Sequence, residues 1–232
     1  MSSSRTIGKK AIVVDGASLS CMRERVDIGI FKWKELHRVL NEDIGKEAPF
    51  ERARYITRKV RTDGSPPHSG RDHFNSVVSN AGFFIKEAEG QGKSPDDAAV
   101  IEYIESLPEH IEEIIIVTSD SHFIPCLNER KERGARIYWV TTKYPHPTRL
   151  GSHIGAELSK LFESNQFTFI ELATYADRIR LTRLNDLKFN WSITNVTVSH
   201  RTDIYVDRRS LIEYFEKARD LFPGVRIEIQ KA

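Results

Sequence analysis

The sequence predicts an α/β domain with a central, mostly parallel sheet and helices on both faces. Between residues 11 and 172, short apolar runs alternate about six times with segments of helical spacing, and the links between them are short. Such alternation implies parallel strands joined by right-handed crossovers, in a three-layer arrangement. After about residue 180 the pattern changes. We therefore expect one domain over residues 1–180 and a small α+β appendage over residues 183–232.

The predicted strands are short apolar runs bounded by turn residues. The first ends at Asp15-Gly16, and the most apolar lies at residues 114–118, where isoleucine and valine dominate. Continuous β-branched runs of this length are typical of parallel strands that are buried on both faces. The predicted strands are residues 11–14, 52–60, 82–85, 114–118, 136–141 and 167–172.

The predicted helices have start and stop signals as well as apolar periodicity. Ser94-Pro95 opens one of them, because serine caps a helix and proline suits its first position. Gly134 follows another and is expected to end it in the left-handed conformation. The predicted helices are residues 31–40, a segment that ends near 80, and residues 94–107, 123–133 and 150–162.

Composition favours a globular protein in a reducing compartment. The chain carries 35 basic and 33 acidic residues, a formal charge of +2, which argues against a strongly basic nucleic-acid coat but leaves local patches open. Its two cysteines, Cys21 and Cys126, form neither a disulfide framework nor a zinc quartet. No apolar run reaches the roughly 20 residues that a membrane helix needs. We expect a cytoplasmic protein without a signal peptide or membrane association.

Acidic residues gather where the predicted strands end and one helix begins. Asp15 and Asp120 each follow a predicted buried strand, and parallel strands end at one edge of a sheet. Asp96 and Asp97 open the helix that leads to the second of these strands, and Glu102 follows. Carboxylates brought together repel one another unless a cation compensates, and oxygen ligands suit Mg²⁺ or Mn²⁺. A water on that cation could attack a phosphodiester.

Each acid also has an ordinary structural interpretation. Two acids in the first turn of a helix interact favourably with its dipole, as Asp96 and Asp97 would. Asp120 could cap the helix that follows it, and Asp15 could be a turn residue. Glu102 would point about 240° away from Asp96 on an ideal helix. The two converge only if Asp96 lies at or outside the first turn.

Three segments resemble motifs of the NYN family of PIN-like nucleases, in particular its LabA-like branch. Residues 15–19 (DGASL) look like the family's D-G-x-N-L opening, and residues 93–102 (KSPDDAAVIE) are similar to its K-G-x-D-x-x-L-x-x-D segment. Residues 116–125 (IVTSDSHFIP) resemble its L-V-S-G-D-S-D-F-x-P block. The resemblance spans roughly residues 8–175. It implies a PIN-like fold and metal-dependent, endonucleolytic cleavage of single-stranded RNA, with DNA as the other option.

Carried over by position, the resemblance implies that Asp15, Asp96 and Asp120 hold Mg²⁺ or Mn²⁺. Asp97 matches a second acid found in some branches, and Glu102 stands where an aspartate is usual. These five acids are the predicted catalytic residues.

The chain departs from the family motifs at three positions. Ser18 replaces an asparagine that helps to orient substrate, His122 replaces an aspartate, and Ser119 replaces a glycine. We expect Ser18 and His122 to face the substrate. Because these changes alter residues expected around the metal and the substrate, the alternative is a weakened or inactive NYN-fold module that binds nucleic acid or protein.

Basic residues follow the predicted strand at 136–141. Lys143 and Arg149, near His146 and His153, could hold the phosphate backbone of RNA. An ordinary basic loop explains them equally well. The appendage at 183–232 could support a homodimer or bind a protein partner.

Overall fold

The computed structural model describes residues 9–45, 48–59, 69–89, 94–144 and 156–183. The chain divides into a unit of residues 1–186 and a unit of residues 187–232, and all described residues belong to the first. Beyond residue 183, the predicted appendage lies outside the described residues and stays a prediction. No helix in the described ranges combines the length and the apolar character that crossing a membrane requires.

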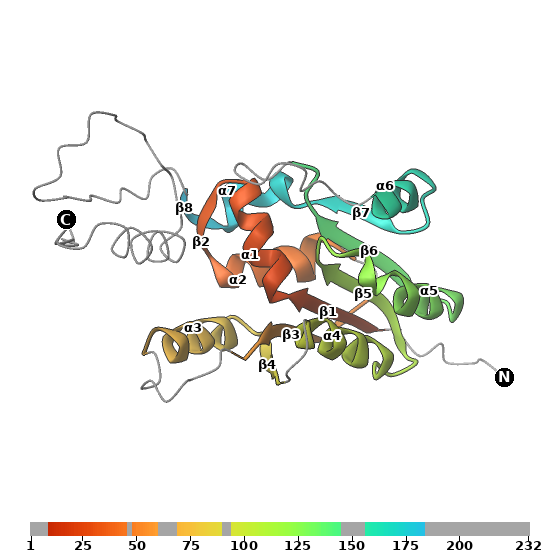
Figure 1. Ribbon diagram of the computed structural model, residues 1–232, viewed down its shortest axis with the longest axis horizontal. Helices are drawn as coiled ribbons and strands as arrows, with labels where there is room; N and C mark the ends of the chain where they lie inside the picture. Colours follow the sequence, from red (N-terminus) through yellow and green to blue (C-terminus); the bar gives the residue numbers. More distant parts are fainter. Residues whose placement is uncertain (1–8, 46–47, 60–68, 90–93, 145–155, 184–232) are drawn as a thin grey trace, which may run out of the picture. The chain divides into compact units, whose positions relative to one another are not determined.

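A six-stranded, wholly parallel sheet forms the centre of the first unit, in the order β4-β3-β1-β5-β6-β7 (Figure 1). This confirms the predicted parallel α/β class. The strands are β1 (Lys9–Asp15), β3 (Phe50–Arg58), β4 (Phe84–Ala88), β5 (Ile111–Val117), β6 (Arg136–Thr141) and β7 (Thr168–Glu171).

Helices cover both faces of this sheet. Successive residues of the central strands alternate between two apolar clusters, so that Val13 and Ile116 pack in one and Val14 and Val117 in the other. The first cluster is completed by α4 (Pro95–Glu105), α5 (Ile124–Glu132) and α6 (Ala156–Glu163). The second is completed by residues from α1 (Gly16–Arg25), α2 (Trp33–Arg38), η1 (Val39–Asp43), α3 (Ser69–Asn80) and α7 (Ala176–Ile179). The result is a three-layer domain.

Some elements differ from the predicted ones. The predicted helix at 31–40 is in fact the end of β2 (Ile28–Phe31) followed by α2 and the π-helical turn η1. β2 pairs antiparallel with β8 (Arg180–Arg183), and the sequence did not indicate either strand. Helix α1 was also missed. Gly134, in contrast, has a φ of 97° and ends α5 as predicted.

The register of the sheet brings three strand ends together. Val14 of β1 is paired with Val117 of β5, which is paired in turn with Val140 of β6. Asp15, the last residue of β1, lies opposite Ile56 of β3. The residues that follow these positions therefore leave the sheet at one edge, where the acidic residues were expected to meet.

Candidate metal site

Asp15 is buried at the end of β1 and caps α1. Its Oδ1 accepts hydrogen bonds from the backbone N–H groups of Ala17 (3.0 Å) and Ser18 (3.1 Å). Only 3% of its surface is exposed. Because Gly16 is a poor helix former and Ser18 only a moderate one, the cap explains why a helix begins directly after the strand. The turn interpretation and the site interpretation of Asp15 are thus compatible.

Thr118 connects Asp15 to Asp120. Its Oγ1 lies 2.9 Å from Asp15 Oδ2 and 3.0 Å from Ser18 Oγ, and it accepts a hydrogen bond from the backbone N–H of Asp120 at 3.1 Å. The indole Nε1 of Trp139 donates to the Thr118 carbonyl at 2.8 Å. Thr118 is fully buried, so this network fixes the start of the Asp120 loop from inside the protein.

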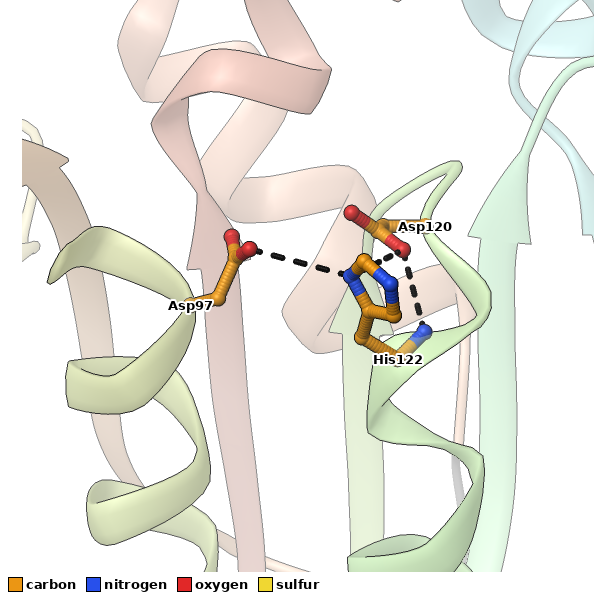
Figure 2. Close-up of side chains that lie close together, drawn as sticks. All are labelled: Asp97, Asp120 and His122. Atoms are coloured by element: carbon orange, nitrogen blue, oxygen red, sulfur yellow. Dashed lines mark hydrogen bonds and ion pairs between the residues drawn. The ribbon is translucent and has the colours of Figure 1, made fainter. Parts of the chain in front are cut away.

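Asp97, Asp120 and His122 form a compact group at the sheet edge (Figure 2). One ligand atom from each lies within 4.8 Å of the others. His122 Nδ1 is 3.1 Å from Asp120 Oδ1 and 3.7 Å from Asp97 Oδ2. Asp97 comes from the first turn of α4, while Asp120 caps the 3₁₀ turn η2 (Ser121–Phe123) by accepting the N–H of His122 at 3.0 Å.

Burial and neighbouring negative charges raise the pKa values of two acids at this edge. Burial raises the pKa of Asp97, and the nearby charges of Asp120, Asp96 and Asp15 raise it further, against a hydrogen bond from Ser94. Burial also raises the pKa of Asp15, and Asp96 adds to the shift, while hydrogen bonds from Ser18 and Thr118 oppose it. Four carboxylates therefore interact, as expected for acids gathered without a counter-ion.

The donor set suits a divalent cation. Two carboxylates and one imidazole offer oxygen and nitrogen ligands, a combination that Mn²⁺ and other first-row transition metals accept more readily than Mg²⁺ does. His122 is exposed, and Asp97 and Asp120 are partly exposed, so that an ion from solvent can reach them. A cation held by the three side chains would replace the direct contacts of His122 Nδ1 with the two carboxylates.

The other predicted site residues lie in different surroundings. Asp96 is in the first turn of α4 and outside the compact group of three. Glu102 points to solvent with 72% of its side chain exposed, where it pairs with Lys86 at 2.8 Å, and this contact lowers its pKa. Ser18 contacts Thr118.

The two predicted phosphate-binding residues have different outcomes. Lys143 follows β6 and places its Nζ 4.6 Å from the centre of the Phe169 ring. Arg149, with His146 and His153, lies outside the described residues, so its predicted role stays a prediction.

Sequence reasoning missed Thr118. A hydroxyl residue two positions before Asp120, directly after a buried strand, is the signal that could have indicated it. His122 was predicted to face the substrate, which stays a prediction, and its ring lies near Asp97 and Asp120, where it is also a candidate metal ligand.

Neither a family model nor a curated protein matches this chain. A crystal structure of a protein of unknown function from Vibrio parahaemolyticus is similar, with a TM-score of 0.49 and 14% sequence identity. The match covers 75% of this chain and 98% of the other. Because the function of the Vibrio protein is unknown, the likeness concerns the fold alone.

Proposed function

We propose that this protein is a metal-dependent nuclease that hydrolyses phosphodiester bonds of single-stranded RNA within the strand. The observation that carries the proposal is the group of Asp97, Asp120 and His122 at the carboxyl edge of the parallel sheet. Open α/β sheets form their sites at this edge. The resemblance of residues 15–19, 93–102 and 116–125 to NYN motifs supports the same activity.

Asp97, Asp120 and His122 would hold the cation, Mn²⁺ or Mg²⁺. When bound, such an ion supplies positive charge to a phosphodiester and lowers the pKa of a water it coordinates. Asp15 and Asp96, the other predicted ligands, would add negative charge that attracts the ion, because both raise the pKa of Asp97. Ser18 and Thr118 would keep Asp15 in position.

A labelled single-stranded RNA tests the proposal. We expect cleavage with Mn²⁺ or Mg²⁺, none with chelator, and none by Asp120→Asn, because that variant loses a ligand charge. Glu112→Gln is a matched control, since Glu112 is an exposed acid near the opposite end of β5. If wild-type protein leaves the RNA intact with Mn²⁺ and also with Mg²⁺, the proposed nuclease activity is contradicted. A DNA strand of the same sequence shows whether the sugar matters.

A non-cleaving binding module is the second candidate. It is favoured by the Asp15 carboxylate, whose two oxygens already hold internal hydrogen bonds, and by a histidine among the ligands. Unchanged binding of RNA by wild type and Asp120→Asn, without cleavage under either ion, would support it. The cytoplasmic location and a homodimer or protein partner through residues 183–232 stay predictions.

A further inference from the structure

A pocket lies beside β7, at the outer edge of the sheet and away from the acidic group. Its volume is about 500 Å³, and its walls come from α6, from the connection to β7, from β7 itself and from Lys143. Three aromatic rings line it, those of Phe162, Phe167 and Phe169. The volume falls in the range of sites for small organic groups.

The ring of Phe169 faces this pocket. Lys143 and Phe169 both line the pocket, and the Lys143 ammonium group lies over the Phe169 ring at 4.6 Å from its centre. Phe162 packs against the same ring with a centroid distance of 4.8 Å. A ring face that holds an exposed ammonium group can also hold another flat or positive group, because the lysine side chain is long and can move away.

Polar groups stand around these rings. Ser159, Asn165 and Thr168 line the pocket with hydrogen-bond donors and acceptors, and Glu163 adds a carboxylate acceptor. Aromatic faces combined with such groups suit a heterocycle that has amino and carbonyl edges. A purely aliphatic ligand would leave these polar groups unpaired.

The register of the sheet relates the position of the pocket to that of the acidic group. Val117 of β5 is paired with Val140 of β6, and Asp120 and Lys143 each come three residues after these paired positions. β7 is the next strand beyond β6. Neighbouring strands are about 4.8 Å apart, so β7 lies about 10 Å to the side of β5, the strand that leads to Asp120. Phe169 is paired with Trp139, and Trp139 with Ile116, so the ring also lies four residues back along the sheet from Asp120. A strand of several linked nucleotides can span that separation.

We infer that this pocket binds a nucleobase of the single-stranded substrate, with the base stacked on Phe169 and a neighbouring phosphate held by Lys143. The inference rests on the proposed function, since it names a substrate subsite two strands away from the proposed metal site. Lys143 covers the ring when no base is bound and moves to the phosphate when a base takes its place. Stacking on aromatic rings tolerates every base, so the pocket holds the strand without choosing its sequence.

Binding of single-stranded RNA by the full chain in chelator tests the inference separately from cleavage. The probe is an oligonucleotide that carries 2-aminopurine, whose fluorescence is quenched when it stacks. We expect Phe169→Leu to weaken binding roughly 5- to 100-fold and to abolish the quenching, because leucine keeps apolar volume but has no ring. Phe169→Tyr should retain both.

Two lysine variants distinguish a phosphate contact at the pocket from a general effect of positive charge on RNA binding. Lys143→Met should weaken binding and lower the salt dependence by about one counter-ion. Lys160→Met, an exposed lysine of α6 that does not line the pocket, should do neither.

The outcomes keep the two proposals apart. If Phe169→Leu is folded by circular dichroism and binds RNA as tightly as wild type, the pocket assignment is overturned even if cleavage persists. Wild-type protein that binds no single-stranded RNA overturns it as well. If the ring and charge variants lose binding but wild type never cleaves, the pocket stands and the nuclease fails.

Discussion

Replacing Thr118 by valine tests whether a buried hydroxyl organises the site. Valine has nearly the same shape but removes the contacts to Asp15 Oδ2 (2.9 Å), Ser18 Oγ (3.0 Å) and the N–H of Asp120 (3.1 Å). Three groups lose a partner, but the Ser18 hydroxyl keeps its hydrogen bond to Asp15. The cost therefore comes from the carboxylate oxygen and the backbone N–H. Each costs about 1–3 kcal/mol when left unpaired in the interior, and the N–H is only partly buried. We expect the free energy of unfolding to fall by about 2–4 kcal/mol.

Urea denaturation followed by tryptophan fluorescence measures this loss, because Trp139 donates to the Thr118 carbonyl and reports on the same region. Thr118→Ser is the matched control, since it keeps the hydroxyl and removes only a methyl group. Mn²⁺ titration is the second readout: the valine variant should bind the ion more weakly than the serine variant. If valine changes the unfolding free energy by less than about 0.5 kcal/mol and leaves Mn²⁺ binding unaltered, the network does not position Asp120.

Two further predictions concern charge. The raised pKa of Asp97 means that its ionised form destabilises the fold, so Asp97→Asn should raise the melting temperature of metal-free protein at neutral pH. The same variant should show no further increase in melting temperature when Mn²⁺ is added. A lower melting temperature of the metal-free variant would contradict this. Burial lowers the pKa of His37, against the opposing charge of Glu42. The stability from its neutral form is therefore present above the unfolded pKa of about 6.5 and is lost as the pH falls below it. A His37→Phe variant should lose less stability than wild type between neutral pH and pH 5 in urea titrations, and equal losses would refute the role of His37.

Most of the sheet could be predicted because buried parallel strands leave a strong pattern. Residues 136–141 were predicted with the bounds that β6 has, since every position is extended and most are buried. Helix α1 left no such pattern, because only Leu19 and Met22 among its large side chains are buried, and its start depends on the Asp15 cap. β2 and β8 were missed because their pairing joins segments that are far apart in the chain.

The sequence indicated which acidic residues gather at the sheet edge, but it did not indicate how their side chains are arranged. Asp97 and Asp120 were expected at the edge and are found in the compact group there. Helix α4 begins at Pro95, so Asp96 lies inside its first turn. The helical angle then turns Glu102 to the solvent, where Lys86 pairs with it. The position of the exposed His122 ring near Asp97 and Asp120 depends on the turn at η2, which a motif alone does not specify.

The buried hydrogen bonds of Thr118 stabilise the edge of the sheet at which Asp97, Asp120 and His122 gather. Gathering carboxylates at one edge costs stability, as the raised pKa values of Asp15 and Asp97 indicate. Hydrogen bonds offset part of this loss of stability: Asp15 accepts them from N–H groups of α1 and from Thr118, which in turn accepts one from the N–H of Asp120. A protein that required only a helix cap would have no reason to place further acids in the same field. A bound cation would relieve the repulsion that remains, so the arrangement favours the proposed metal site over capping alone.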